Sequence, residues 1–374
     1  MKVMIYCQHV LGIGHFFRSM EIAQGLHRHK VLFVEGGEPV SGFRVPSHVQ
    51  RVFLPPLMMD AQFKTMEVRN GPLEEIRHKR SRILWETFRE FDPDVFVTEL
   101  FPFGRKRFAF EIMPVLEETA GGRFRARVVC SLRDILVEKG DQATYEERVL
   151  GTLNPYYHLL LIHSDPALVR LEDTFFQTAR ISIPTHYTGF VVRRAPRVKK
   201  QEGVRVIVLS SGGGKVGYDL MASSIQAFRS LPFSNLRLRV FLGPFTEPLH
   251  RDLLFQMASQ DIRISVHPFS LDFLGELARA DLSVSMAGYN TCMDILSVGL
   301  KAIVHPFSQN REQALRARRL ESLGVLRVVE TLEVESLAAC MKEEMERSQE
   351  RGRVSLDLNG AENTTRLLEN LVSP

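Results

Sequence analysis

The stretch LSVSMAGYNTCMD, residues 282–294, decides the fold of this chain. Residues 282–285 alternate apolar side chains with serines, a pattern typical of a strand. Ala287 and Gly288 form a turn of small residues, and the polar residues after them open a helix. An apolar run follows at 302–305. Strand, turn, helix and strand in this order are typical of a βαβ unit in a parallel sheet.

The same pattern extends over the whole chain and divides it into two halves. With 374 residues, the chain exceeds the size at which one hydrophobic core keeps growing. We expect an N-terminal domain over 1–192, a linker over 193–203 (RRAPRVKKQEG), a C-terminal domain over 204–356, and a final segment 357–374 whose helix packs back on the first domain. The predicted fold class is α/β: two Rossmann-like, doubly wound domains with ligands in an interdomain cleft.

The individual elements follow from apolar runs and helical periodicity. In the first half we expect strands at 3–7, 31–35, 51–54, 95–98, 127–131 and 159–163, with helices at 16–27, 73–91, 105–118 and 141–153. In the second half we expect strands at 205–209, 237–242, 263–266, 282–285, 302–305 and 326–329, with helices at 217–231 and 361–372.

Composition excludes several classes of protein. The chain has 44% hydrophobic and 25% charged residues, which is globular, and it shows no signal-peptide core and no apolar stretch long enough for a bilayer. Its four cysteines have no C-x-x-C spacing, so neither a zinc site nor a disulfide framework is expected. These features predict a cytoplasmic protein, soluble or peripheral at the inner face of the membrane.

Basic clusters lie in the first half although the net charge is only +4. They are residues 77–80, residues 105–107, and Arg123, Arg125 and Arg127. Two interpretations stay open: solvated helix faces, or attraction to an anionic membrane or a phosphorylated substrate. In the second case the aromatic residues interleaved with residues 105–107, Phe101, Phe103 and Phe108, would help to seat the domain on a membrane. Nucleic acid is not expected, because no binding module is present.

The turn after the first strand, GIGHFFR at residues 12–18, combines glycines with an ionisable ring. Ligands of parallel sheets bind at the carboxyl ends of strands, so His15 is placed either as a general base or as a structural residue of the helix start. The strands expected at 95–98 and 127–131 are also followed by charged residues, which indicate either an acceptor site or a buried salt bridge. The candidate catalytic residues are His15, Glu99 and Asp134, and the candidate acceptor-side residues are Gly12, Gly14, Arg18, Arg105 and Arg133.

The turn SSGGGKVG, residues 210–217, has the composition of a phosphate cradle. It matches G-x-G-x-x-G, but the next strand ends at Phe241-Leu242-Gly243 without the acidic residue that a dehydrogenase needs for its ribose. It is also no Walker loop, because Lys215 is followed by valine. A dehydrogenase is therefore not expected, and the turn taken alone is weak evidence for its ligand.

The block from His267-Pro268-Phe269 through residues 282–294 to Pro306-Phe307 and Glu312-Gln313 resembles the C-terminal domain of the family 28 glycosyltransferases. Its best-known member is the peptidoglycan N-acetylglucosaminyltransferase that makes lipid II. The resemblance implies the GT-B fold and a UDP-sugar donor. It covers roughly 205–330, and in the first half it is limited to the glycine turn with its histidine.

The resemblance also implies roles for individual residues. Asp294 matches the acidic ligand of the ribose, although the family usually has Glu there; backbone near Phe269 would pair with uracil; and Glu312 and Gln313 match the pair that binds the sugar hydroxyls. Turns 211–214 and 288–291 would hold the diphosphate. The structural alternative for this whole set is that these residues cap helices or lie as polar side chains on the protein surface. The donor-binding residues are Ser211, Gly212, Gly213, Gly214, Phe269, Gly288, Tyr289, Asn290, Thr291, Asp294, Glu312 and Gln313.

No metal or other cofactor is expected. The pair Asp92 and Asp94 imitates a D-x-D metal motif, but it precedes its strand and therefore lies at the amino end of the sheet, where it is a helix-to-strand connection.

We therefore expect an inverting glycosyltransferase that moves a hexose, GlcNAc by family analogy, from a UDP-sugar to the hydroxyl of an unidentified acceptor, lipid-linked or anionic acceptors being alternatives. The segment 12–18 also resembles UDP-sugar hydrolases of nonulosonic acid biosynthesis. A UDP-GlcNAc 2-epimerase and a non-enzymatic nucleotide-sugar binder remain further alternatives.

Overall fold

The computed structural model describes residues 1–10, 14–40, 43, 45–59, 65–68, 71–137, 139–307, 311–347 and 355–373. The contacts divide the chain into two compact units: unit 1 contains Met1–Val191 and Leu356–Pro374, and unit 2 contains Val192–Ser355. The first division lies one residue from the end of the expected first domain, and the segment expected to act as a linker is counted with unit 2.

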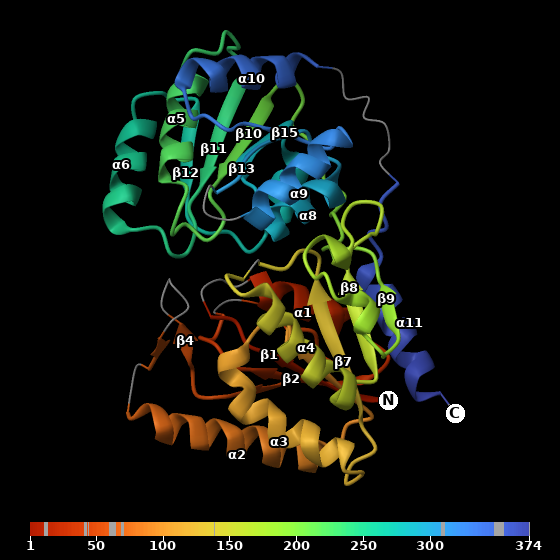
Figure 1. Ribbon diagram of the computed structural model, residues 1–374. Coiled ribbons are helices and arrows are strands. Elements are labelled where there is room, and N and C mark those ends of the chain that lie inside the picture. The colour runs from red at the N-terminus through yellow and green to blue at the C-terminus, as the bar shows by residue number, and fades with distance from the viewer. Residues whose placement is uncertain are drawn as a thin grey trace. The chain divides into compact units, whose positions relative to one another are not determined.

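Unit 1 is a parallel sheet with helices on both faces (Figure 1). Its strands run in the order β3-β2-β1-β6-β7-β8-β9, so the strand order reverses between β1 and β6. The strands are β1 Lys2–Cys7, β2 Lys30–Glu35, β3 Val49–Phe53, β6 Val95–Glu99, β7 Arg127–Arg133, β8 Leu159–His163 and β9 Thr185–Tyr187, and a separate antiparallel pair is formed by β4 Met58–Met59 and β5 Met66–Glu67. The helices are α1 Gly14–Gly25, α2 Leu73–Phe91, α3 Ala109–Ala120, α4 Gln142–Tyr156 and α11 Gly360–Val372.

The two faces of this sheet carry separate hydrophobic cores. Helices α2, α3 and α4 pack on one face, and α1 and α11 pack on the other. Helix α11 lies directly against α1, where a Cβ on Gly25 would be 3.2 Å from the carbonyl oxygen of Ala361, so a larger residue there would push the two helices slightly apart. His29 Nε2 lies 2.8 Å from Glu369 Oε1 in the same contact. The C-terminal helix therefore belongs to the first unit.

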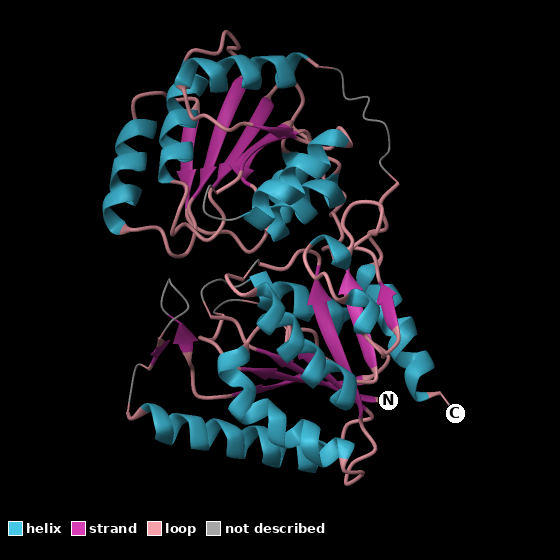
Figure 2. Cartoon of the chain, in the orientation of Figure 1, coloured by secondary structure: helices cyan, strands magenta, loops and turns pink. Residues whose placement is uncertain are grey.

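Unit 2 repeats the architecture with the strand order β12-β11-β10-β13-β14-β15, and here the order reverses between β10 and β13 (Figure 2). All of its strands pair in parallel: β10 Arg205–Ser210, β11 Leu236–Phe241, β12 Ile264–His267, β13 Leu282–Met286, β14 Ala302–His305 and β15 Arg327–Val328. The helices are α5 Tyr218–Arg229, α6 Pro248–Ala258, α7 Phe273–Arg279, α8 Tyr289–Val298, α9 Arg311–Ser322 and α10 Val334–Glu346.

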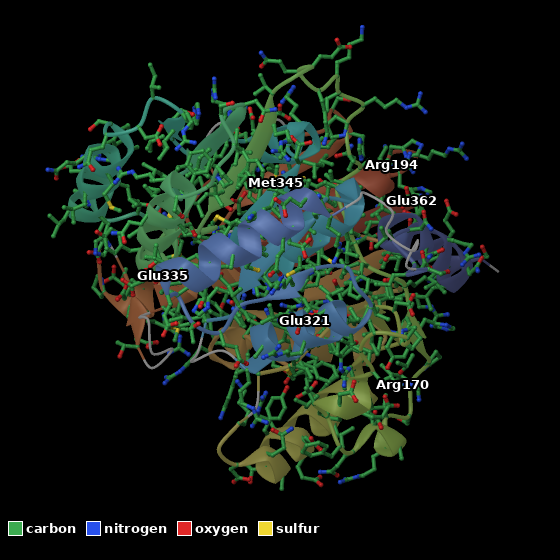
Figure 3. The ribbon with its side chains drawn as sticks, turned by 90° about the horizontal axis from the view of Figure 1, so that it is seen from above. Arg170, Arg194, Glu321, Glu335, Met345 and Glu362 are labelled. Carbon is green, nitrogen blue, oxygen red and sulfur yellow. The ribbon has the colours of Figure 1, made fainter. Side chains whose placement is uncertain are left out.

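Helices also cover both faces of the second sheet. Helices α5, α6 and α10 contribute to the larger core, whereas α7 packs on the opposite face. Figure 3 looks down on unit 2 and shows α10 between the labelled residues Glu335 and Met345, with Glu321 of α9 beside it. No helix among the described residues is long and apolar enough to cross a membrane.

Two sequence expectations about surface groups are wrong. The phenylalanines expected to seat the first domain on a membrane are 1–2% exposed, because they pack into the core beneath α2 and α3: these are Phe101, Phe103 and Phe108. In the cluster 77–80, Arg80 is 0% exposed and is no part of a solvated face. The segment expected to be a helix from residue 105 begins with a 3-10 turn, Lys106–Phe108, before α3.

The Asp92 and Asp94 pair lies at the connection between α2 and β6, as expected from the sequence. Asp92 ends α2 in the left-handed conformation, and Asp94 Oδ2 accepts a 2.6 Å hydrogen bond from the backbone N–H of Lys2. Among the residues that the structure describes, no group of three or more His, Cys, Asp or Glu side chains could hold a metal ion.

Candidate functional site

The switch point of unit 1, between β1 and β6, carries His15 and Glu99. His15 is the second residue of α1, and Glu99 is the last residue of β6. The distance from His15 Nδ1 to Glu99 Oε1 is 2.6 Å, and Arg18 Nη2, one turn further along α1, donates to the same carboxylate oxygen. We call His15 and Glu99 the dyad. Because a sheet binds its ligands at such a reversal of strand order, the dyad occupies the expected ligand position of unit 1.

The hydrogen bonds of the dyad fix which ring nitrogen carries the proton. An ionised carboxylate only accepts, so Nδ1 of His15 is the protonated nitrogen and Nε2 keeps its lone pair. Burial lowers the pKa of His15 to about 3. The carboxylate of Glu99 raises this pKa, and the positive charges of Arg105 and Arg18 offset part of that increase. The ring is therefore neutral at pH 7, with an available acceptor nitrogen and a side chain that is 19% exposed.

Glu99 stays ionised although it is fully buried. Burial alone would raise the pKa of its carboxyl, but the hydrogen bond from His15 and the charges of Arg18 and Arg105 hold that pKa below its usual value. The side chain of Glu99 is 0% exposed. The sequence left acceptor chemistry and a buried salt bridge open for this strand end, and the structure shows the ion pair with Arg18.

The remaining acceptor-side candidates occupy neighbouring strand ends. Gly14 starts α1, and Arg133 ends β7. Asp134 follows β7 directly and is 0% exposed. Arg105 lies in the turn after β6 with φ 59° and donates from Nε to the carbonyl oxygen of Gln8, 2.6 Å away. Gly12 lies outside the described residues.

A buried network next to the dyad escaped the sequence analysis. Arg80 of α2 forms a bidentate ion pair with Glu111 of α3, from Nε to Oε2 at 2.8 Å and from Nη2 to Oε1 at 2.6 Å. The same guanidinium binds Gln8 Oε1 at 2.6 Å and the carbonyl oxygen of Gly36 at 2.7 Å, and Tyr6 donates to Glu111. The network thus ties two helices to the ends of β1 and β2.

One signal in the sequence could have placed Arg80 in the interior. It lies four residues before Leu84 and eight before Phe88, and these three residues are the buried ones of α2. Positions four apart share a helix face, so Arg80 belongs to the apolar stripe of that helix.

The switch point of unit 2 is built from small residues instead of charges. The turn 211–214 follows β10, and Gly212 and Gly214 have φ angles of 67° and 87°, which favour glycine. A Cβ on Gly243 would lie 2.3 Å from the backbone nitrogen of Gly214, so this neighbouring loop also approaches too closely for a side chain. Tyr218 then opens α5.

The second predicted diphosphate turn lies on the adjacent strand. Gly288 follows β13 and precedes α8, whose first turn contains Tyr289, Asn290 and Thr291. Arg316 of α9 lies over the ring of Tyr289, 5.2 Å from its centroid. Turns 211–214 and 288–291 therefore lie on adjacent strand ends at the reversal of strand order, and the backbone N–H groups in the first turns of α5 and α8 are suited to an anion.

Asp294 has an ion-pair partner that the sequence did not indicate. It lies in α8, is 4% exposed, and contacts Arg193 through Nε to Oδ1 at 3.2 Å and Nη2 to Oδ2 at 2.5 Å. Burial raises the pKa of Asp294, and Arg193 opposes that shift. The hydroxyl of Ser297 binds the carbonyl oxygen of Arg193 at 2.5 Å, so both ends of Arg193 are held by α8.

The residues expected to contact the sugar and base lie on other elements of unit 2. Glu312 and Gln313 are in the first turn of α9, where Glu312 is 8% exposed and Gln313 Oε1 accepts from the backbone N–H of Phe307 at 3.2 Å. Phe269 follows β12 and is 39% exposed. In the strand order, β12 is separated from β10 by β11, so Phe269 lies away from the switch point.

Comparison with known proteins relates part of the chain to a family and the whole chain to solved structures. Residues 245–365 match the glycosyltransferase family 28 C-terminal domain. The fold is similar to that of CalG4, the calicheamicin glycosyltransferase, with 15% identity, a TM-score of 0.62, and coverage of 99% of this chain and 97% of that chain. MurG of Acinetobacter baumannii gives 15% identity, a TM-score of 0.60 and 99% coverage of both chains. No protein of curated function matches the sequence.

A plant enzyme shares the fold as well. UGT2 of Phytolacca americana, solved with UDP-2-fluoro-glucose and pterostilbene, has 13% identity, a TM-score of 0.58, and coverage of 99% of this chain and 94% of that chain. These likenesses confirm the predicted GT-B fold, and the domain match confirms the predicted family 28 type of the C-terminal domain. The family 28 likeness is thus limited to residues 245–365, and together with the shared fold it makes the protein a glycosyltransferase.

Proposed function

We propose that the protein transfers a hexose from a UDP-sugar to an acceptor hydroxyl with inversion at the anomeric carbon, with His15 as the general base. The observation that carries the proposal is the dyad: a neutral imidazole, oriented by a buried carboxylate, at the switch point of unit 1. Nε2 of His15 would take the proton of the acceptor hydroxyl as that oxygen attacks the anomeric carbon. Glu99 would keep the ring in the required tautomer and stabilise the imidazolium that forms.

The donor side of the proposal rests on unit 2. Backbone N–H groups of turn 211–214, and of turn 288–291 at the start of α8, would hold the diphosphate and stabilise it as it leaves. Asp294 would accept hydrogen bonds from the ribose hydroxyls. Arg193 uses one position on each carboxylate oxygen, and each oxygen has a further lone pair for a hydroxyl.

The finer assignments belong to the same proposal. Glu312 and Gln313 would bind the hydroxyls of the donor sugar, and GlcNAc is the sugar that the family 28 match favours. Phe269 would lie near the uracil. We further propose that the enzyme needs no metal ion, because backbone donors replace it, and that it acts in the cytoplasm.

The experiment is a product analysis with UDP-GlcNAc, UDP-glucose and UDP-galactose, each incubated with and without a mixture of glycoside acceptors. We expect a new β-linked glycoside, seen by NMR of the anomeric proton, only when an acceptor is present. His15→Ala should bind UDP normally and form no product. Rapid release of free sugar without acceptor would instead show a UDP-sugar hydrolase, and an isomerised nucleotide sugar would show an epimerase.

A further inference from the structure

Buried polar atoms without a hydrogen-bond partner gather beside the dyad. Within the part of the chain that the structure describes, these atoms include His9 Nδ1, Glu35 Oε1, Glu99 Oε2 and Arg105 Nη2. A buried polar group left unpaired loses its hydration without compensation, so such groups are normally satisfied by protein, water or a ligand. We call His9, Glu35, Glu99 and Arg105 the polar edge.

The sheet brings these four residues to one place. Glu35 ends β2, His9 follows β1 by two residues, Glu99 ends β6, and Arg105 lies in the turn after β6. Strands β2, β1 and β6 are neighbours, and Glu35 pairs in register with Cys7 at the end of β1. Adjacent strands lie about 4.8 Å apart, so the three strand ends span about 10 Å, the width of one hexose with its hydroxyls.

Existing contacts decide the chemistry that Glu35 and His9 still offer. Arg51 donates from both Nε and Nη2 to Oε2 of Glu35, which leaves Oε1 as an unused acceptor. His9 Nε2 lies 2.8 Å from the carbonyl oxygen of Glu38, which can only accept, so Nε2 carries the proton and Nδ1 has a lone pair. Burial lowers the pKa of His9, and the ring therefore stays neutral.

Glu99 and Arg105 complete the set. Oε1 of Glu99 accepts hydrogen bonds from His15 and Arg18, and its Oε2 remains available as an acceptor. Arg105 donates a hydrogen bond from Nε to the carbonyl oxygen of Gln8, and its Nη2 remains available as a donor. The polar edge thus offers three acceptor atoms and one donor atom.

The loop after β2 is shaped to hold this arrangement. A Cβ on Gly36 would lie 2.1 Å from Gln8 Oε1, and a Cβ on Gly37 would lie 2.5 Å from His9 Nε2. Only glycine at these two positions lets Gln8 and His9 pack against the end of β2.

From this balance of donors and acceptors we propose that the polar edge is a subsite for an uncharged, hydroxyl-bearing group, a sugar or polyol, on the acceptor. A hydroxyl can donate to a carboxylate or an imidazole nitrogen and at the same time accept from Arg105. A phosphate or carboxylate only accepts, so it would satisfy Arg105 and face three acceptor atoms. An ammonium only donates, and it would leave Arg105 unpaired. The assignment of this group to the acceptor rests on the proposed transferase function.

The test uses saturation-transfer NMR on the full-length protein with methyl β-D-glucoside, N-acetylglucosamine and myo-inositol as neutral probes, and with glucose 6-phosphate as the anionic probe. We expect at least one neutral probe to bind, and glucose 6-phosphate to bind more weakly than methyl β-D-glucoside. In Glu35→Gln, Arg51 would retain the amide oxygen, so an NH2 donor would replace the free acceptor. Binding of the neutral probe should then fall at least fivefold, whereas the exposed control Glu86→Gln should bind as the wild type does.

A second variant guards against loss of folding. His9→Gln keeps a donor for the carbonyl oxygen of Glu38 and removes the lone pair of Nδ1, so it should weaken the neutral probe with little change in melting temperature. Absence of neutral-probe binding, tighter binding of the phosphate, or unchanged binding in both folded variants would overturn the proposal. UDP is titrated in parallel to separate the two proposals. Binding of the neutral probe without binding of UDP would refute the transferase function and support the subsite. Binding of UDP without binding of the neutral probe would refute the subsite and leave the transferase function standing.

Discussion

The two units share a topology and differ in what they place at its switch point. In unit 1 the reversal between β1 and β6 carries buried ionisable groups, including the dyad and Arg18. In unit 2 the reversal between β10 and β13 carries glycines and the serines Ser210 and Ser285, which pair in register. The same sheet edge can therefore carry buried ionisable side chains or small residues, and the residues after the strands decide which.

The two kinds of edge should respond to different disturbances. Charges buried together shift each other's pKa, so the chemistry of unit 1 depends on individual side chains. Backbone N–H groups at helix starts do not titrate, so anion binding by unit 2 should depend on turn conformation and little on pH.

The largest effect is expected in the dyad. His15→Ala should reduce turnover about 10²–10⁴-fold, the usual loss for a general base, while UDP affinity changes little because UDP is assigned to unit 2. Glu99→Gln should also reduce turnover, since an amide can donate to Nδ1 and favour the wrong tautomer. Steady-state kinetics and calorimetric UDP titration of the same samples check both. The wild-type rate should lack an imidazole limb near pH 6.5, because the pKa of His15 lies at about 3.

The next effect concerns the stability of unit 1. Arg80→Met would leave Glu111 buried without its bidentate partner and should lower the free energy of unfolding by about 3–5 kcal/mol. Arg77→Met, which removes an exposed pair with Glu74 on the same helix, should cost less than about 1 kcal/mol. Denaturant unfolding followed by fluorescence of Trp85, the single tryptophan and part of α2, reports on unit 1.

A double-mutant cycle separates the pair from its surroundings. Adding Glu111→Gln to Arg80→Met should recover part of the lost stability, because no charge then remains buried alone. Equal losses for the exposed and the buried arginine variants would mean that the network does not support the strand ends.

The elements themselves were largely predictable from the sequence. The helix expected at 73–91 is α2 with the same bounds, and the strand expected at 159–163 is β8. These segments have strong periodicity and clear boundaries. The β4–β5 pair and β9 were missed, because two or three residues carry no periodic signal.

Side-chain partners were less predictable than strand ends. The position of His15 and Glu99 at one sheet edge follows from strand order, but their contact depends on residues 84 positions apart. Arg193 was assigned to a charged linker, and its ion pair with Asp294 spans 101 positions. Sequence patterns indicate which edge a residue occupies, and long-range packing decides which atom it meets.

Ligand binding to unit 2 gives a smaller effect than the dyad. UDP should bind equally with EDTA and with magnesium, and Asp294→Asn should weaken it by about 1–3 kcal/mol, since the ribose hydroxyls lose a charged acceptor. Strict dependence on magnesium would exclude the backbone account. Asp252→Asn, on the exposed side of α6, is the matched control.

The variant Arg193→Gln tests how the UDP affinity depends on pH through the charge of Asp294. Burial raises the pKa of Asp294 and Arg193 lowers it, so removing the guanidinium should raise that pKa further. A raised pKa leaves more of the carboxyl protonated as pH falls, and UDP affinity of this variant should therefore drop more between pH 8 and pH 5.5 than that of the wild type. Parallel pH profiles would show that Arg193 does not act through the charge of Asp294.

Glu312 and Gln313 provide a contrast within unit 2. Their proposed contacts are to the donor sugar, so Glu312→Ala and Gln313→Ala should reduce turnover of the UDP-sugar while UDP affinity changes by less than about 0.5 kcal/mol. Equal losses for UDP and for the UDP-sugar would place these side chains away from the sugar.

The smallest expected change between variants at neutral pH concerns the acid sensitivity that buried histidines confer on unit 1, which appears only as the pH falls. His163 lies between Ser131 Oγ at 2.7 Å and Thr188 Oγ1 at 2.9 Å, and burial lowers its pKa to about 3. An unfolded histidine titrates near 6.5, so between pH 6.5 and 3 the unfolded chain binds a proton that the folded one does not. The stability from the neutral ring is complete above pH 6.5 and falls as pH drops, by about 1.4 kcal/mol per pH unit. His163→Gln should make the decline of unfolding free energy between pH 6 and pH 5 shallower by about that amount, measured by Trp85 fluorescence, whereas the exposed His78→Gln should leave the slope unchanged. An equal slope in both variants would mean that His163 is already protonated in the folded protein. A protonated ring would then need another partner among the charged groups of unit 1.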